Sequence, residues 1–316
     1  MKHNIRHALI VAICFLTTSA QALDRLKLAV GAPGNWDTCV SEVGKRAGIF
    51  AKHGLDLEII FTNGGGETMQ AVISGSVDIG IAAGAAAAMA AHVKGAPVRI
   101  LLAGTTGTSD LFWYVPSNSP IKSFSDTNAK LVAYSTNGAS THTTLLALIE
   151  TFKTTAKPTG TGAAAVTLTQ AMTNQVDVGW ASPPFGLKQL RSGEIRVIAR
   201  GSDAPSTRDQ TVRVHIVNAQ ALTARKEAID RFAKAYRESL AYLYDTQEGL
   251  KHYAEYAQID IDLAAQIRDQ FMPKEAMNPD KVSGIDAITK DAIAFKVLQK
   301  PLSDAELREL IQIPPP

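Results

Sequence analysis

Apolar and polar residues follow two rhythms along the first part of the chain. Leu26, Leu28 and Val30 alternate with polar or small residues and lead into a loop rich in glycine and proline at 31–34, which is typical of a strand that ends in a loop. Further strands are predicted over 55–61, 77–81 and 98–102. Helical spacing predicts a helix capped by Asp37 or Thr38, a short helix after Gly64–Gly66 and an alanine-rich helix over 85–92. Strands and helices that alternate in this way predict an α/β fold with a doubly wound, mostly parallel sheet.

The same order of elements begins again near residue 130. Strands are predicted over 131–134, 176–180 and 195–199 and around Val166 and Leu168, and Ser140 is predicted to cap a helix between the first two of them. The halves also share short sequences. Gln-Ala at 70–71 precedes Val-Asp-Ile-Gly at 77–80, and Gln-Ala at 170–171 precedes Val-Asp-Val-Gly at 176–179. The chain is therefore predicted to form two lobes built on one plan.

Two further extended segments, 111–115 and 212–217, follow the two halves, and only helical patterns come after the second segment. We predict that the chain crosses from lobe 1 to lobe 2 near residue 110 and returns near residue 214. Lobe 1 then consists of residues 23–109 and 215–316, with the helical tail packed on it, and lobe 2 consists of residues 110–214. Two crossings make a two-segment hinge, and the carboxyl ends of the strands of both sheets line the cleft.

The first 22 residues have the layout of a secretory signal peptide. Lys2 and Arg6 precede nine apolar residues at 8–16, and small residues then allow cleavage after Ala22. The apolar stretch is too short for a membrane span, which takes about 20 residues. We therefore expect an exported, periplasmic protein.

Composition narrows the class of protein further. The chain is 46% hydrophobic and 20% charged, as in ordinary globular proteins. Its 32 Lys and Arg against 30 Asp and Glu become 30 against 30 once Lys2 and Arg6 are removed, and a neutral chain argues against nucleic acid as a partner. Cys39 is then the only cysteine, which excludes an intramolecular disulfide and favours a buried apolar thiol.

Several segments resemble one known family. Residues 48–57, Gly-Ile-Phe-Ala-Lys-His-Gly-Leu-Asp-Leu, match a Gly-Ile-Phe-x-x-x-Gly-Leu-x-Val segment of that family. Further matches follow in the expected order at 64–67, 75–80, 94–98, 121–126 and 130–133, with a departure at 127–129. On these residues the chain resembles the extracytoplasmic solute-binding proteins of ABC importers, in the branch that includes sulfonate, taurine, nitrate and thiamine-precursor binders.

The resemblance implies a two-lobed periplasmic-binding-protein fold of type II that closes on a small solute and delivers it to an ABC permease in the inner membrane. It implies a binding protein rather than an enzyme, without cofactor or metal, and we expect a monomer. It does not identify the solute, because members of this branch share the scaffold and differ in their loops. In this family, loops that match Gly65–Gly66 and Ala83–Gly84 commonly face the ligand.

Candidate ligand-binding residues lie where predicted strands end or predicted helices begin. Glycines let backbone N–H groups approach a ligand, and a helix that starts there points its positive end toward the cleft. Trp36 and Trp180 fall at such positions in opposite lobes and are interpreted as walls of the site, with burial in the core as the alternative. The full set is Trp36, Asp37, Gly65, Gly66, Glu67, Ala83, Gly84, Ser140, Thr141, His142, Trp180 and Ser182.

Charge gives a first hypothesis about the ligand. Asp37 and Glu67 are acidic, and these loops hold no Lys or Arg, which favours a zwitterionic or nitrogen-bearing solute such as a heterocycle. A sulfonate or taurine-like ligand is favoured instead if both carboxylates only cap their own helices. His142 lies in the first turn of a helix and is interpreted either as a neutral, ligand-binding imidazole or as a solvated surface residue.

Two alternatives to a transport function stay open. A ligand-sensing module for a membrane receptor shares the fold. A thiamine-precursor enzyme shares it too, but its cysteine-rich motif has no counterpart here, and the sequence lacks G-x-S-x-G and H-E-x-x-H motifs. Gly160-Thr161-Gly162 is not assigned to dinucleotide binding, because it follows Pro158 rather than a predicted strand.

Overall fold

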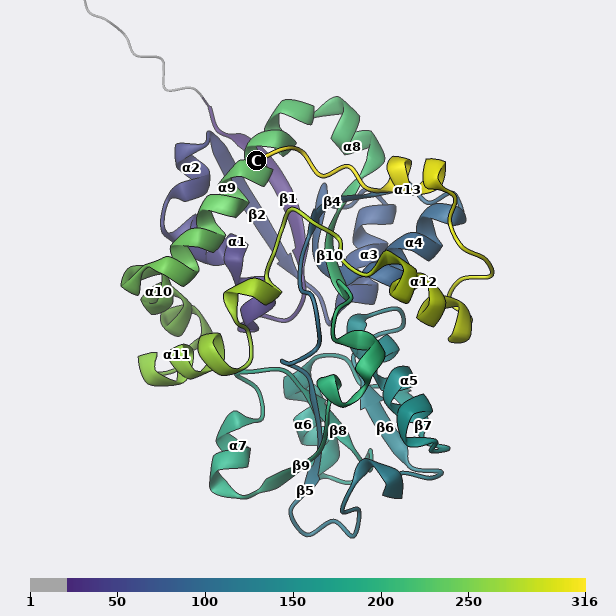
Figure 1. Cartoon of the computed structure of the whole chain (residues 1–316). Coiled ribbons are helices and arrows are strands. Elements are labelled where there is room, and N and C mark those ends of the chain that lie inside the picture. The colour runs from purple at the N-terminus through teal and green to yellow at the C-terminus, as the bar shows by residue number, and fades with distance from the viewer. Residues whose placement is uncertain (1–21) are drawn as a thin grey trace, which may run out of the picture.

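A computed structural model describes residues 22–316, and the predicted signal peptide lies outside the described residues apart from Ala22. The first sheet has five strands in the order β2-β1-β3-β10-β4. It lies in the upper half of Figure 1. Its strands are β1 (Asp24–Val30), β2 (Leu55–Phe61), β3 (Ile79–Gly84), β4 (Val98–Ala103) and β10 (Arg213–Asn218). Strand β10 runs antiparallel to its neighbours β3 and β4, so the other four strands share one direction.

Helices cover both faces of this sheet, as the alternating pattern predicts. They are α1 (Trp36–Arg46), α2 (Ile49–Lys52), α3 (Gly65–Ile73) and α4 (Ala85–Val93). Leu26 and Leu28 pack in one core cluster with residues of α1, whereas Ala29 packs in a second cluster with residues of α3 and α4. Side chains of one strand thus point alternately to the two helical layers.

The strands of the second half are β5 (Phe112–Pro116), β6 (Leu131–Tyr134), β7 (Lys157–Gly160), β8 (Gly179–Ala181) and β9 (Ile195–Arg200). They form the sheets β8-β5-β9 and β6-β7, and a parallel bridge between Val132 and Val178 joins the two. The combined order β7-β6-β8-β5-β9 therefore repeats the order β2-β1-β3-β10-β4. In both halves, the fourth strand runs antiparallel to its neighbours. The helices of this half are α5 (Ser140–Phe152), α6 (Ala164–Met172) and α7 (Leu187–Ser192).

The short sequence repeat has equivalent contacts in both halves. The Asp78 carboxylate accepts a hydrogen bond from the backbone N–H of Lys27 in β1, and the Asp177 carboxylate accepts one from Leu131 in β6, both at 2.8 Å. A second equivalence is a pair of threonine hydroxyls six residues apart, Thr62–Thr68 at 2.8 Å and Thr161–Thr167 at 2.6 Å. The prediction of one plan for both halves is therefore correct at the level of individual contacts.

One predicted strand is wrong. Val166 and Leu168 lie in helix α6, and the strand that precedes it is β7, residues Lys157–Gly160. The alternation of Val166 and Leu168 resembles a strand, but alanine, glutamine and methionine around them favour a helix. The pattern of apolar residues does not predict strand β7, because β7 is a polar edge strand, where Pro158 is tolerated. Gly160 is the last residue of β7, so the segment that begins with it does come at the end of a strand, which removes the reason for setting that segment aside.

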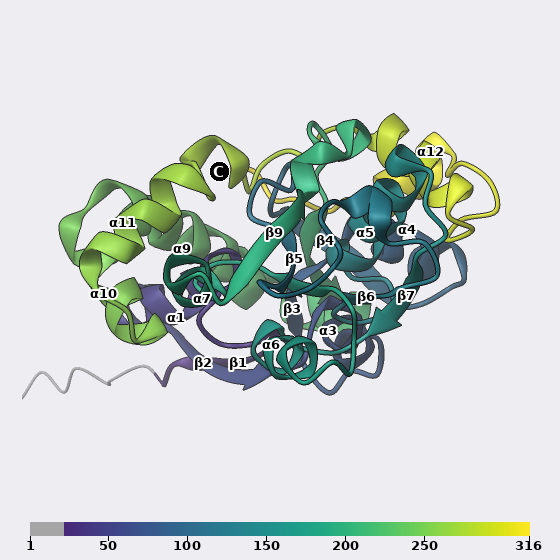
Figure 2. The same cartoon turned by 90° about the horizontal axis from the view of Figure 1, so that it is seen from below.

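Two segments connect the halves, residues 104–111 and 201–212, which we call the crossing segments. They lie side by side, with a bridge between Thr106 and Thr211 and a 2.8 Å contact between the hydroxyls of Thr108 and Thr207. The second segment contains the short 3₁₀ helices Gly201–Asp203 and Pro205–Thr207. Figures 1 and 2 show the chain passing between the two groups of strands here.

The tail is helical and packs on the first sheet, as predicted. Helices α9 (Lys226–Asp245), α10 (Gln247–Ala257) and α11 (Ile261–Gln270) lie on the side of α1, and α12 (Ile285–Ala294) and α13 (Asp304–Leu310) lie beside α4. Helix α8 (Ala219–Ala224) follows β10. The tail also touches the crossing segments, where Thr106 and Thr211 donate backbone hydrogen bonds to Ala276 and Ser283.

Within residues 22–316, no helix combines the length and the apolar character that a membrane crossing requires.

Candidate functional site

The N-termini of four helices converge on one cavity between the two halves, which we call the central cavity. Asn35 and Asp37 come from the start of α1, Gly64 and Gly65 from α3, Ser140 from α5, and Ala164 from α6. The first N–H groups of a helix have no partner within that helix and carry its positive dipole end. Convergence of four such ends favours a ligand with negatively charged or hydrogen-bond-accepting oxygens.

The central cavity has a volume of about 70 Å³, enough for a small solute, since a single water needs about 10–15 Å³. Its walls are Gly31, Ala32, Asn35, Asp37, Thr38, Asn63, Gly64, Gly65, Ala82, Leu111, Ser135, Ala139, Ser140, Thr141, Ala163, Ala164, Trp180, Ser182 and Arg213. Glycine, alanine and hydroxyl side chains dominate this lining, so the backbone lies close to any bound molecule.

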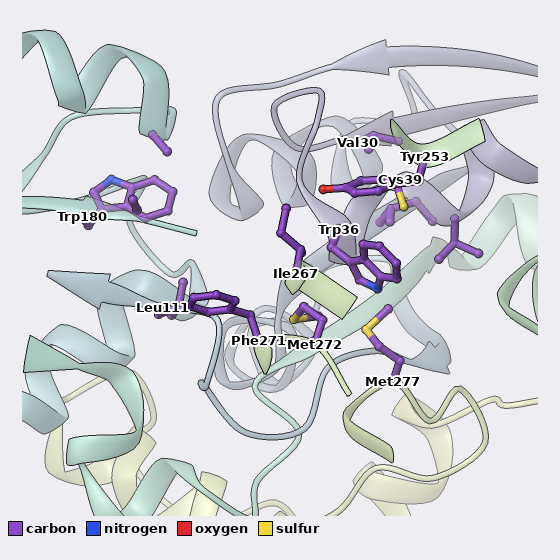
Figure 3. Close-up of a cluster of buried hydrophobic side chains, with 14 of the residues drawn as sticks. Val30, Trp36, Cys39, Leu111, Trp180, Tyr253, Ile267, Phe271, Met272 and Met277 are labelled. Carbon is purple, nitrogen blue, oxygen red and sulfur yellow. The ribbon is translucent and has the colours of Figure 1, made fainter. Parts of the chain in front are cut away.

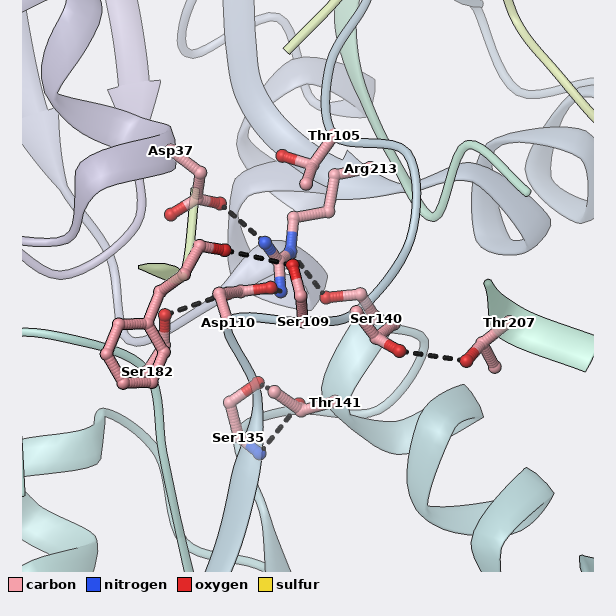
Figure 4. A network of polar contacts seen from close by, with 12 residues as sticks. Asp37, Thr105, Ser109, Asp110, Ser135, Ser140, Thr141, Ser182, Thr207 and Arg213 are labelled. Carbon is pink, nitrogen blue, oxygen red and sulfur yellow. Dashed lines mark hydrogen bonds and ion pairs between the residues drawn. The ribbon is translucent and has the colours of Figure 1, made fainter. Parts of the chain in front are cut away.

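Arg213, at the start of β10, lies in the wall between two carboxylates (Figure 4). Its Nη2 lies 3.0 Å from Oδ2 of Asp110 and its Nη1 lies 3.3 Å from Oδ2 of Asp37. Its Nε donates a 2.8 Å hydrogen bond to the hydroxyl of Ser140, and the hydroxyl of Ser182 donates one of 2.8 Å to Asp110. This network joins five parts of the chain: helix α1, the first crossing segment (Asp110), the start of β10 (Arg213), helix α5 and the loop after β8.

The Asp37–Arg213–Asp110 triad is almost completely removed from water, with side chains that are 8%, 5% and 1% exposed. Burial raises the pKa of the Asp37 carboxyl, against the lowering effect of Arg213, and the neighbouring Asp110 adds to the rise. Asp37 therefore takes up a proton more easily than an ordinary aspartate. The acidic character of the cavity is correspondingly weaker than its two carboxylates suggest.

Two buried donors in the cavity wall make no hydrogen bond among the described residues. They are Nη1 of Arg213, whose contact there is the 3.3 Å ion pair with Asp37, and Nε1 of Trp180. Buried N–H groups are almost always hydrogen-bonded in native proteins, to protein or to another molecule. Two such donors in one cavity indicate a place for acceptor atoms of a ligand.

Six of the twelve predicted residues line the central cavity: Asp37, Gly65, Ser140, Thr141, Trp180 and Ser182. Six do not: Trp36, Gly66, Glu67, Ala83, Gly84 and His142. The predicted caps also need correction. Asn35 precedes α1 and Ala139 precedes α5, so Ser140 is the first helical residue, and its hydroxyl accepts from Arg213 instead of capping the helix.

The structure corrects the placement of Trp36, which belongs to the core and not to a cavity wall. It is 1% exposed and packs against the ring of Tyr253 with centroids 4.5 Å apart. Its indole N–H donates a 2.7 Å hydrogen bond to the hydroxyl of Tyr244. Figure 3 shows it beside Cys39 and separated from Trp180. The indole turns inward because helix α1 directs this first residue toward α9 and α10.

Replacing Trp36 with phenylalanine is expected to lower the free energy of unfolding by about 1–2 kcal/mol. The variant loses the hydrogen bond to Tyr244 and part of its packing volume but touches nothing in the central cavity. Chemical denaturation measures the stability, and isothermal titration calorimetry with a solute that the wild type binds measures the affinity. A large loss of affinity at unchanged stability would return Trp36 to the ligand site.

Glu67 and His142 do not line the central cavity, and each has a structural partner. The Glu67 carboxylate accepts a 2.9 Å hydrogen bond from the backbone N–H of Asn63, so it caps the start of its own helix. The His142 ring stacks on Tyr134 with centroids 4.3 Å apart, and burial lowers the pKa of its imidazole. His142 is therefore neutral, in line with one interpretation of the sequence, but its ring packs on a tyrosine.

Gly66 and Gly84 lie where the two halves touch. The backbone N–H of Gly66 donates a 2.9 Å hydrogen bond to the hydroxyl of Thr136. A Cβ atom at Gly66 would lie 2.4 Å from the carbonyl oxygen of Asn137, and one at Gly84 would lie 2.1 Å from that of Gly138. No side chain fits at either position in this arrangement, so these glycines serve contact between the halves.

Sequence reasoning missed Arg213 and Asp110, because it searched only the loops at strand ends. The available signal was a charge inside the apolar run at 212–217, where Arg213 stands between two valines. A charged residue in such a run must find a buried partner. Ala163 and Ala164 were missed for another reason, because the strand before them was not predicted.

His215 lies two residues beyond Arg213 and is 1% exposed, and burial lowers the pKa of its imidazole from 6.5 to about 3. Since the unfolded chain binds this proton below about pH 6.5 and the native chain does not, His215 stabilises the fold fully above that pH and loses its contribution as the pH falls toward 3.

When the pH falls from 7.5 to 5, the free energy of unfolding of the wild type is therefore expected to decrease by about 2 kcal/mol more than that of His215→Asn. Guanidinium titrations of both proteins at the two pH values measure it. A difference that stays constant would mean that His215 titrates normally.

Within residues 22–316, no cluster of three or more His, Cys, Asp or Glu is arranged to hold a metal ion.

Comparison with known proteins gives one family match and several solved structures of similar fold. Residues 41–249 match the sequence profile of the family described as NMT1/THI5 like. The alkanesulfonate-binding protein SsuA from Xanthomonas axonopodis pv. citri, bound to MOPS, has a TM-score of 0.77 at 16% identity, with 93% of this chain and 100% of that chain covered. The periplasmic nitrate-binding protein NrtA from Synechocystis PCC 6803 has a TM-score of 0.70 at 14% identity, with 92% and 86% covered.

An enzyme also shares the fold. The desulfurization enzyme DSZB has a TM-score of 0.62 at 13% identity, with 92% of this chain and 96% of that chain covered. A search of curated protein sequences gives no match. The structural likenesses establish the fold, and the match over residues 41–249 bears out the resemblance found in the sequence.

Proposed function

This chain belongs to the NMT1/THI5-like family, and from that membership we propose that it is an exported protein that captures a small solute in the central cavity and hands it to an ABC permease. The proposed lobes are residues 23–109 with 215–316 and residues 110–214, and the crossing segments form the hinge. The predicted signal peptide supports a periplasmic location, and we propose a monomer.

Contacts across the central cavity support closure of the two lobes on the solute. The hydrogen bond from Gly66 to Thr136 and the close approach of Gly84 to Gly138 join residues from opposite lobes. These contacts exist only while the lobes are together, and a solute that touches both lobes adds differential binding energy in favour of that state.

We propose a small anionic solute of the sulfonate class, and two buried donors that make no hydrogen bond among the described residues, Arg213 Nη1 and Trp180 Nε1, carry this proposal. A tetrahedral oxyanion accepts several hydrogen bonds at once, from these two donors and from the helix N-termini. The argument for a nitrogen-bearing ligand loses its basis, since Glu67 caps its helix and Asp37 faces Arg213.

Binding rather than catalysis is also supported by the state of Cys39. Burial raises the pKa of this thiol well above its usual value, and the nearby Asp37 adds to the rise. A nucleophilic cysteine needs the opposite shift. The cavity wall instead combines helix N-termini and hydroxyl groups with the buried Arg213–Asp37 ion pair, and such groups can bind a ligand.

Thermal unfolding of the exported form with ethanesulfonate, taurine, nitrate and aminopyrimidines tests this function. A ligand at about 100 times its dissociation constant adds about 2.7 kcal/mol to the stability of the native state. We expect a rise in melting temperature with ethanesulfonate or taurine. A rise with aminopyrimidines alone would contradict the sulfonate class. Trp180→Phe, which removes the indole donor and part of the ring volume, should weaken binding of a genuine ligand.

A further inference from the structure

Strand β3 has a bulge where it meets β10. Val214 pairs with Ala83 and Ile216 pairs with Gly80, so His215 alone faces two residues of β3. One of these, Ala82, has a φ of 61°, in the left-handed region. A non-glycine residue in this region costs about 1–2 kcal/mol relative to ordinary backbone and is retained when surrounding contacts hold it.

The bulge directs the backbone of Ala82 toward the ligand site. Ala82 lines the central cavity. Its carbonyl oxygen also supports the start of helix α3, since a Cβ atom at Gly65 would lie only 3.1 Å from it. The position of Ala82 thus determines part of the cavity wall and also where the N-terminus of helix α3 lies.

His215 supplies the contact that holds this bulge. The backbone N–H of Ala82 donates a 3.1 Å hydrogen bond to Nδ1 of His215 in place of a strand partner. Because Nδ1 accepts, the proton of the neutral ring is on Nε2. The ring is 1% exposed and is held at its other side by the ring of Tyr236, with centroids 4.7 Å apart.

We propose that His215 is a positioning residue of the ligand site, whose Nδ1 fixes Ala82 in its left-handed conformation and thereby places the cavity wall and the N-terminus of α3. His215 itself does not line the cavity. The proposal deepens the function proposed above and rests on it for the part that concerns the ligand.

Two variants of the full exported chain distinguish the role of the Nδ1 hydrogen-bond acceptor from that of the side-chain volume at position 215. In His215→Asn, the side-chain oxygen takes the place of Nδ1, whereas His215→Leu has a similar size without an acceptor. Amide hydrogen exchange of Ala82 by NMR, without ligand, is expected to be at least about tenfold faster in the leucine variant and within about threefold of wild type in the asparagine variant. Exchange at Ile79 serves as the internal control. Equal protection of Ala82 in wild type and the leucine variant would overturn the proposal.

Affinity for ethanesulfonate and taurine provides the second measurement. We expect the leucine variant to bind at least about tenfold more weakly than wild type and the asparagine variant to recover most of that loss. Fast exchange at Ala82 combined with wild-type affinity would show that the bulge has no role in binding and would overturn the proposal. If wild type binds neither probe, the sulfonate class fails, while the exchange measurement still decides whether His215 holds Ala82.

Discussion

Arg213→Met is expected to lower the free energy of unfolding by about 3–5 kcal/mol, because it leaves Asp37 and Asp110 as buried carboxylates without a cation. Both side chains are less than a tenth exposed, so water cannot replace the guanidinium. The variant also removes a cationic side chain that lines the central cavity, and we expect no measurable binding of a solute that the wild type holds. Guanidinium denaturation and isothermal titration measure the two effects.

Two comparisons make this result specific. Arg213→Lys keeps the charge but loses the fork that contacts Ser140 and Asp110 together, so we expect it to fold with an affinity about 10–100-fold below wild type. Lys52→Met removes the cation of an exposed pair with Glu238, with side chains 68% and 38% exposed, and should change stability by less than about 1 kcal/mol. Wild-type affinity in Arg213→Lys would contradict the role of the guanidinium in the site.

Gly84→Ala is expected to weaken solute binding by about 10–100-fold with little effect on the ligand-free fold. Gly84 has a φ of −65° and a ψ of 129°, which alanine adopts without strain. The new methyl group meets only the opposite half, where its carbon would lie 2.1 Å from the carbonyl oxygen of Gly138. On the proposed closure, the two halves then cannot come together as they do here, and a solute loses its contacts to one of them.

Gly160→Ala is the matched control, since an added Cβ there has 3.6 Å to its nearest neighbour, the hydroxyl of Tyr134. Titration of both variants with the same solute, together with their melting temperatures without it, distinguishes blocked closure from misfolding. Equal affinity in wild type and Gly84→Ala would mean that the bound state does not bring Gly84 against Gly138.

The fold was largely predictable from the sequence, and the candidate site only in part. Strands such as 55–61 and 131–134 were predicted with their observed bounds, because each is a short run rich in apolar residues between polar residues or glycine. Strand β7 was missed because an edge strand with one neighbour needs few apolar residues. Six of the predicted ligand residues line the central cavity, since strand ends and helix starts gather at one edge of each sheet.

The sequence by itself determined the α/β class, the repeated plan of the two halves and the family, because periodicity and short motifs are properties of neighbouring residues. The tertiary structure alone decided which polar groups meet. Arg213 and Asp110 are 103 residues apart in the chain, and their pairing depends on how the crossing segments lie against each other. The burial of Trp36 and the contact of Gly84 with Gly138 depend likewise on packing between distant segments, which no local pattern encodes.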